Sequence, residues 1–241
     1  LTVRAGERIC LVGPNGSGKS TFARLIAGLA APDGGDITLL GHRAYADALP
    51  NADEYRAARR GIGVVFQNPE DQLVTTVLED DVAFGPENLG IERSRIGERI
   101  DDSLKSVGLV SFRQSDPTRM SGGQQQRAAI AGMLAMSPAM LVLDEPTAML
   151  DESARAEVMR ILDDLQAQGT TIVHVTHHQD ETVHADRIVH MESGQIVGIE
   201  AVSARPQTIA NHPSPDEPHQ PGRDVAFPLL SDASNDDATD P

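Results

Sequence analysis

The chain has 241 residues, of which 39% are hydrophobic, and this length is sufficient for a domain with a sizeable buried core. Its 36 acidic residues exceed its 20 basic residues, and the net charge of −16 argues against nucleic acid or an anionic membrane surface as the main partner. The single cysteine, Cys10, excludes a disulfide within one chain and suits a reducing cytoplasm, and no run of about 18 apolar residues predicts a membrane span.

Segments typical of strands and of helices alternate along the chain. Apolar runs predict strands over 7–12, 35–41, 60–67, 139–144 and 170–177, with a closing hairpin over 186–200. Apolar spacings of three and four predict helices over 20–30 and 152–168, and a helical stretch from 68 to about 137. We therefore expect an α/β fold with a mostly parallel sheet and an inserted helical subdomain.

The composition changes at about Ala201. The residues that follow are rich in Pro, Ser, Asp and Asn and show almost no apolar periodicity, which is typical of a disordered segment. We expect one folded domain over 1–200 and a disordered, acidic, proline-rich tail over 201–241. A solubilising extension and a binding segment are both compatible with this composition, and deletion after about Val202 is expected to spare activity.

A phosphate-binding loop follows the first predicted strand and opens the first predicted helix. It consists of Gly13, Pro14, Asn15, Gly16, Ser17, Gly18, Lys19, Ser20 and Thr21. The glycines allow backbone amides to face phosphate oxygens, Lys19 is placed to reach the β- and γ-phosphates, and the Ser20 hydroxyl suits Mg²⁺. The alternative is a chance glycine-rich turn, which the strand before the motif and the helix after it disfavour.

Polar side chains also follow other predicted strands. Asp144 and Glu145 end one of them, where Asp144 is placed to hold Mg²⁺ and Glu145 to polarise an attacking water. Gln67 is placed to reach metal or water, and His177 to contact the γ-phosphate. Taken singly, each side chain is equally typical of a solvated strand end. A metal site among the histidines between 174 and 184 is disfavoured because no cysteine or compact carboxylate set accompanies them.

The stretch RMSGGQQQR predicts a second helix start suited to an anion. Ser121 is a natural N-cap, and Gly122 and Gly123 leave the first-turn amides uncovered. One chain therefore carries two predicted phosphate-binding helix starts.

The P-loop, Gln67, SGGQ, LVLDEP, AMLD and the final TH occur in an order and spacing that resemble the ATP-binding cassette ATPases over residues 1 to about 200. The resemblance implies a P-loop NTPase core, ATP and Mg²⁺ as ligands, and head-to-tail pairing of two such domains. Each ATP would lie between one P-loop and the partner's signature residues, which are Ser121, Gly122, Gly123 and Gln124 acting in trans. Asp151 would lie at the dimer seam, the catalytic residues would be Glu145, His177 and Gln67, and the Mg²⁺ ligands Ser20, Gln67 and Asp144.

A narrower resemblance concerns residues 67–90, which are similar to the same segment of energy-coupling-factor and cobalt- or nickel-type importer ATPases. It implies a peripheral ATPase subunit at the cytoplasmic face of the cell membrane that powers uptake of a vitamin or a transition-metal ion. Its partners would be a second ATPase subunit (a copy or a paralogue), a transmembrane coupling subunit and a substrate-binding membrane subunit, without nucleic acid. The segment would line an acidic groove for a basic coupling helix, although a solvated face explains each of its acids equally well: Glu70, Asp71, Glu79, Asp80 and Asp81.

Three other functions are compatible with the same motifs. An exporter or another importer class is disfavoured by the 67–90 segment, and a cassette ATPase acting on ribosomes or DNA by the acidic single domain. A catalytically inactive binding subunit is disfavoured by the presence of Glu145, Gln67 and His177.

The chain departs from the resemblance in three places. Met120 stands where the family usually has Leu, and the acidic tail replaces a folded C-terminal region that aids pairing. No aromatic residue precedes Phe22, so we expect the sequence to be truncated before Leu1, where an edge strand and an adenine-stacking aromatic would lie. Because such stacking contributes ~1–3 kcal/mol, a version extended by about twenty residues is expected to bind ATP about ten- to a hundredfold more tightly.

Overall fold

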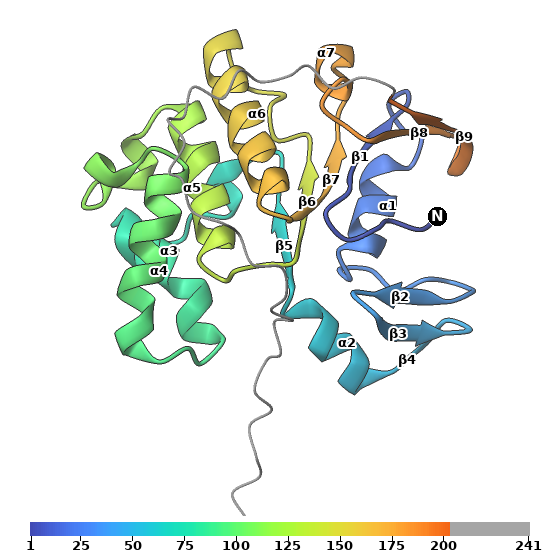
Figure 1. Ribbon diagram of the computed structural model, residues 1–241, viewed down its shortest axis with the longest axis horizontal. Coiled ribbons are helices and arrows are strands. Elements are labelled where there is room, and N and C mark those ends of the chain that lie inside the picture. Colours follow the sequence, from blue (N-terminus) through green and yellow to red (C-terminus); the bar gives the residue numbers. More distant parts are fainter. Residues whose placement is uncertain (203–241) are drawn as a thin grey trace, which may run out of the picture. The chain divides into compact units, whose positions relative to one another are not determined.

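A six-stranded sheet lies at the centre of the fold, and the computed structural model describes residues 1–202. The strand order is β5-β6-β7-β1-β8-β9, in which β9 runs antiparallel to β8 and the other neighbours are parallel (Figure 1). The strands are β1 (Arg8–Val12), β5 (Ile62–Val65), β6 (Met140–Asp144), β7 (Thr171–Val175), β8 (Arg187–Glu192) and β9 (Gln195–Ala201). The predicted mostly parallel sheet is confirmed for this part of the chain. The predicted tail, apart from its first residues, lies in 203–241 and outside the described residues.

Alternate residues of the inner strands pack into two separate cores, one on each face of the sheet. Leu141 and Leu143 of β6 face a core shared with the helices over 78–134 and 152–167, whereas Met140 and Val142 face a core shared with α1 (Lys19–Ile26). Because both faces are covered, the inner strands read as continuous apolar runs, as is typical of parallel sheets. The parallel direction also brings the residues after β1, β6 and β7 to one edge of the sheet.

The predicted helical stretch contains three α-helices, which are α3 (Leu78–Asn88), α4 (Arg93–Ser106) and α5 (Gly122–Leu134). The short 3₁₀ turn η1 (Pro69–Asp71) precedes α3, and η2 (Val110–Phe112) and η3 (Pro117–Arg119) lie between α4 and α5. These helices form one side of the molecule in Figure 1, and α5 also packs against β5 and α6 (Glu152–Ala167). The helical stretch therefore shares its core with one face of the sheet, and its limits at 68 and 137 as a separate subdomain stay a prediction.

A second, antiparallel sheet was not expected from the sequence. It contains β2 (Ile37–Leu39), β3 (His42–Ala46) and β4 (Leu49–Pro50), and α2 (Ala52–Arg59) follows it. The strand predicted over 35–41 is shorter because Leu40 and Gly41 form a turn with φ values of 50° and 84°. The sequence did not predict the elements over 42–59. The strands β3 and β4 are too short to show an apolar period, and the residues around them are rich in alanine and charge.

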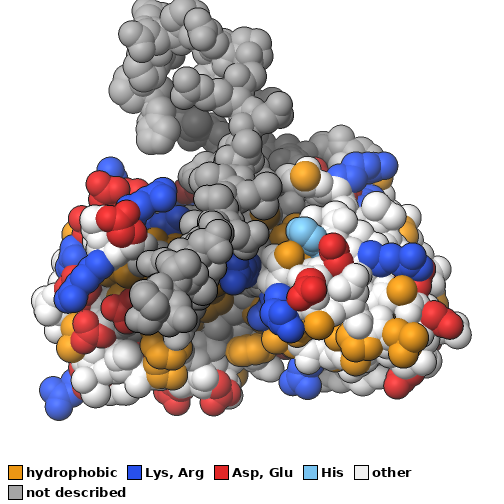
Figure 2. Space-filling model, turned by 90° about the horizontal axis from the view of Figure 1, so that it is seen from below, with side chains coloured by type: hydrophobic (Ala, Val, Ile, Leu, Met, Phe, Trp, Pro, Cys, Tyr) orange, Lys and Arg blue, Asp and Glu red, His pale blue; other side chains and the backbone are white. Residues whose placement is uncertain are grey.

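The surface carries charges of both signs. In the view of Figure 2, basic and acidic side chains lie next to one another with apolar side chains between them, and no continuous basic patch is visible on the coloured surface of this face. Among the helices of residues 1–202, none is long and apolar enough to cross a membrane.

Candidate nucleotide-binding site

The loop over 13–18 joins β1 to α1 and has the conformation of a phosphate cradle. A side chain at Gly13 would place its Cβ 2.1 Å from the Met191 carbonyl oxygen, so only glycine fits there. The α1 helix begins at Lys19, and its N-cap Gly18 (φ 94°) offers no side-chain acceptor to the first-turn amides. The first turn also contains no acidic residue, so the positive end of the helix dipole faces the loop uncompensated.

Two buried polar groups of the loop, on Ser17 and Lys19, are placed to bind a ligand. Lys19 is buried, and its Nζ donates to the carbonyl oxygens of Gly13 at 2.9 Å and of Pro14 at 3.0 Å. The Ser17 Oγ is buried without a hydrogen-bond partner among the described residues, which is costly unless a ligand or water binds it. Both observations fit a loop that is completed by phosphate.

Ser20 and Asp144 meet at the end of the loop. The Ser20 hydroxyl donates to Asp144 Oδ1 at 3.0 Å, although the two residues are 124 positions apart. Burial raises the pKa of Asp144, the Ser20 hydrogen bond opposes this, and the neighbouring Glu145 raises it further. A hydroxyl and a carboxylate oxygen side by side are hard donors of the kind that Mg²⁺ prefers, so the pair fits the predicted ion.

Glu145 and His177 lie together one step further along the same edge. The register places Asp144 of β6 beside Val175 of β7, so the residues that follow these strand ends are neighbours. Glu145 Oε2 lies 3.3 Å from His177 Nδ1, and Glu145 has a left-handed backbone with φ 50°. Gln67 is exposed and lies two residues beyond the end of β5, rather than at its last residue as predicted.

The signature sequence forms the expected helix start. Ser121 is the N-cap of α5 in a capping box, in which its Oγ accepts from the Gln124 amide at 3.4 Å and its own amide donates to Gln124 Oε1 at 2.9 Å. The box leaves the Gly122 and Gly123 amides as the donors available to an anion at this helix start. A Cβ at Gly123 would lie 2.6 Å from the Cβ of Ala154, so this glycine also allows α5 to pack closely on α6.

Asp151 caps the next helix. Its Oδ1 accepts from the Ala154 amide at 2.8 Å and so fixes the start of α6. The side chain is exposed, and Met149, two residues earlier, is 72% exposed, which leaves the loop before α6 open to a neighbour. Its place at a dimer seam stays a prediction.

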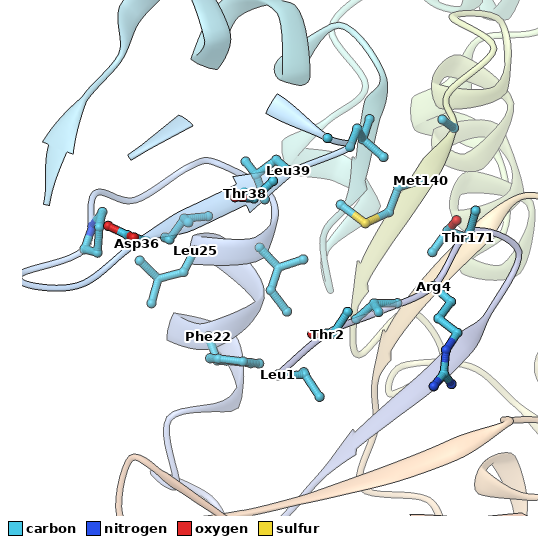
Figure 3. A pocket seen from close by; sticks show the side chains of 18 of the residues that line it. Leu1, Thr2, Arg4, Phe22, Leu25, Asp36, Thr38, Leu39, Met140 and Thr171 are labelled. Atoms are coloured by element: carbon cyan, nitrogen blue, oxygen red, sulfur yellow. The ribbon is translucent and has the colours of Figure 1, made fainter. Parts of the chain in front are cut away.

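A cavity beside the N-terminal residues lies away from this site. It has a volume of about 870 Å³, and Figure 3 shows Phe22 and Leu25 of α1 facing it together with Met140 and Thr171. Met140 and Thr171 begin β6 and β7, so the cavity lies at the opposite edge of the sheet from Asp144 and His177. None of the residues 13–20 lines it. Phe22, expected in the core, is half-buried and packs against the core on the α1 face while also lining this cavity.

A buried carboxylate that sequence analysis missed lies behind Glu145 and His177. Glu181, on α7 (Gln179–Thr182), is 1% exposed and accepts from the hydroxyls of Thr147 and Thr176, each at 2.6 Å. Burial opposes ionisation of Glu181, but its interaction with His174 and the hydrogen bonds from the two hydroxyls prevail and lower its pKa to about 2. An acidic residue in a polar stretch gives no sequence signal of burial, and only the apolar run that precedes it along β7 pointed to this region.

The lowered pKa of Glu181 predicts a pH dependence of stability. Its folded pKa of about 2 lies below the ordinary 4.5, so its contribution is present above pH 4.5 and is lost as the pH falls toward 2. We expect Glu181→Gln to remove about 2 kcal/mol of the fall in unfolding free energy that the wild type shows between pH 6 and pH 3. Urea unfolding of both proteins across this range measures it. Parallel pH profiles would contradict the assignment.

Comparisons with known proteins agree with this geometry. The sequence profile of the ABC transporter family matches residues 1–148. The energy-coupling factor transporter ATP-binding protein EcfA1 of Clostridium perfringens is 49% identical over 200 residues, which cover 82% of this chain and 69% of that protein. The chain belongs to the ABC transporter family. Its membership confirms the predicted P-loop fold and the assignment to the ATP-binding cassettes.

Further ABC transporter relatives extend the comparison. The Bifidobacterium longum protein BL0043, named as an ABC transporter ATP-binding protein, is 72% identical over 98% of this chain, but the chain spans only 33% of that relative's length. The structure of cbiO1 from Clostridium perfringens, described as part of the ABC transporter complex cbiONQ, has a TM-score of 0.76 and 32% identity, covering 84% of this chain and 80% of that one. The dimeric cassette MJ0796 bound to ADP and Pi has a TM-score of 0.74 and 30% identity, covering 85% and 89%.

Proposed function

We propose that the chain hydrolyses ATP as the ATP-binding subunit of an energy-coupling-factor-type importer. The observation that carries the proposal is the meeting of Lys19, Ser20, Asp144, Glu145 and His177 at one edge of the sheet, in a chain 49% identical to an EcfA1 protein. The importer would take up a vitamin or a transition-metal ion, with this subunit bound peripherally at the cytoplasmic face of the cell membrane.

The chemistry of the site supports hydrolysis in the following way. Lys19 exchanges its two carbonyl acceptors in the loop for phosphate oxygens, and the first-turn amides of α1 bind the same phosphates. Glu145 accepts a proton from the attacking water as general base, and His177 contacts the γ-phosphate from beside it. Ser20, Asp144 and Gln67 would hold Mg²⁺, which supplies neutralisation of phosphate charge when bound.

A pair of chains would complete each site. The amides of Gly122 and Gly123, with Ser121 and Gln124, would bind the ATP held by the partner's P-loop, and Asp151 would lie at the seam between the two chains. The dimeric form of the related cassette MJ0796 supports this arrangement. The partner would be a second copy or a paralogue of this chain.

The segment over 67–90 would contact the membrane subunits. Gln72 Oε1 accepts from the Phe66 amide and its Nε2 donates to the Val64 carbonyl, so the loop that carries Gln67 is tied to the end of β5. Val74 and Phe84 are 65% and 52% exposed, and they lie near acidic side chains in the sequence. An amphipathic, basic coupling helix matches such a surface.

Fewer acidic side chains of residues 67–90 are available to a partner than the sequence implied. Asp81 is buried and accepts from the amides of Val74 and Thr75, because it closes the loop before α3. Glu79 pairs with Arg113, so it is engaged within the domain. Of the five acids named from the sequence, Glu70, Asp71 and Asp80 remain exposed and available to a basic helix.

Co-purification with a membrane complex tests the importer assignment. We expect the chain, co-expressed with a transmembrane coupling subunit and a substrate-binding membrane subunit, to be recovered with them after detergent extraction. Asp71→Lys combined with Asp80→Lys should lower this recovery about tenfold, or ~1.4 kcal/mol, and leave the ATPase activity of the free chain unchanged. Asp102→Lys, an exposed change on α4, is the matched control. A chain that hydrolyses ATP but co-purifies with ribosomes or DNA would refute the assignment.

A further inference from the structure

Glu181 joins the two turns that carry Glu145 and His177. One carboxylate oxygen, Oε1, accepts from Thr147, which lies two residues after Glu145, and Oε2 accepts from Thr176, which directly precedes His177. Both bonds are 2.6 Å long and all three side chains are almost completely buried. A single carboxylate thus bridges segments that come from β6 and β7.

Further hydrogen bonds of Thr176 and Thr147 stabilise the two turns to which these residues belong. Thr176 Oγ1 donates to Glu181 and accepts from the His178 amide at 3.0 Å. One hydroxyl therefore fixes the backbone on both sides of His177. On the other side, the Thr147 carbonyl accepts from the Leu150 amide, and the Glu145 carbonyl from the Ala148 amide. These bonds hold the turn in which Glu145 adopts its left-handed backbone.

The surroundings require a carboxylate at this position. His174 Nε2 lies 3.3 Å from Glu181 Oε2, and Arg155 Nε lies 3.8 Å from Oε1. Arg8, which has only donors, faces His174 Nδ1 at 3.4 Å, so the neutral imidazole carries its proton on Nε2, toward Glu181. The nitrogen of an amide has no acceptor lone pair, so at least one of the donors that now face the two carboxylate oxygens would lose its acceptor.

We propose that Glu181 is a positioning residue for ATP hydrolysis, which holds Glu145 and His177 in their paired arrangement through Thr147 and Thr176. The inference rests on the proposed ATPase function and adds to it a residue that touches neither nucleotide nor metal. Without the two hydrogen bonds to Glu181, the turns that carry Glu145 and His177 are no longer linked, and their 3.3 Å contact is no longer held in place. A misplacement of about 1 Å in a catalytic pair costs on the order of a hundredfold in rate.

Steady-state ATPase assays of the full chain with Mg²⁺ and ATP test the role. We expect Glu181→Gln to lower kcat at least about tenfold and to leave KM for ATP within about twofold, because the P-loop contacts are untouched. The matched control is Asp180→Asn, which removes the neighbouring exposed carboxylate and its 3.5 Å contact with Arg155. This control is expected to behave as the wild type.

Hydroxyl-specific variants keep the test independent of folding. Thr176→Ser and Thr147→Ser retain the donors and should keep kcat, whereas Thr176→Val and Thr147→Val lose the donors at nearly constant volume and should reproduce Glu181→Gln. In a Glu145→Gln background, Glu181→Gln should lower turnover by a smaller factor than in the wild-type background, since one of the two groups that it positions is already absent.

The outcomes separate the two proposals. No turnover by the wild-type chain would overturn the proposed ATPase function and this role with it. Wild-type turnover that persists in Glu181→Gln, or an equal loss in the Ser and Val variants, would overturn only the positioning role. A fully additive loss in the Glu145→Gln background would also overturn it, because Glu181 would then not act through Glu145.

Discussion

Glu145→Gln is expected to keep ATP binding and to lower ATP turnover by about a hundredfold or more. The substitution retains the size of the side chain and its position after β6, but an amide does not accept a proton from water. The P-loop, Lys19 and the Ser20–Asp144 contact do not involve the side chain of Glu145, so the nucleotide contacts persist. As a result, ATP should be retained long enough for a pair of chains to accumulate.

Two measurements on Glu145→Gln check this expectation. Steady-state phosphate release reports turnover, and size-exclusion chromatography with and without ATP reports pairing. Glu152→Gln is the matched control, because Glu152 is an exposed glutamate at the start of α6, a few residues further along the chain. Turnover close to that of the wild type would remove Glu145 from the role of general base.

The parts of the site built from consecutive residues could be predicted from the sequence. The P-loop over 13–21 and the helix start at Ser121 each depend on local geometry, namely glycine conformations, a helix N-terminus and a capping box. The meeting of Glu145 and His177 was less certain, because it depends on β6 and β7 being neighbours. The alternation of strands and helices predicts a parallel sheet but not its strand order.

Buried charge was the main feature that the sequence concealed. Asp81 was expected to line a groove and instead accepts two loop amides, and Glu181 was not singled out although it is 1% exposed. In sequence, both look like ordinary helix acids, which are usually solvated. Their burial becomes favourable only when amides or hydroxyls from distant segments satisfy them, and such partners are set by tertiary packing.

The second large effect is expected from Ser121→Arg. It should prevent two chains from pairing around ATP, but each P-loop should still bind ATP. Ser121 is exposed at the start of α5, on the helical side of the domain, whereas the P-loop joins β1 and α1 (Figure 1). A bulky arginine would fill the space of the partner's γ-phosphate. Ser121→Ala controls for the lost N-cap, which is worth about 1 kcal/mol, because it removes the hydroxyl without adding bulk.

Mixed pairs decide whether Ser121 acts on its own nucleotide or on that of the partner. The pairs are formed in a Glu145→Gln background so that ATP is not consumed, and Lys19→Ala removes one P-loop at a time. If Ser121 acts in trans, Ser121→Arg and Lys19→Ala on the same chain should abolish both ATP sites of the pair. The same two changes on separate chains should leave one site intact, so that the pair retains about half of the ATP bound by a pair without them. Action in cis predicts the reverse, because the same-chain combination would then leave the other chain intact. Retention of about half of the ATP by the same-chain pair would therefore rule out the trans assignment of the signature residues.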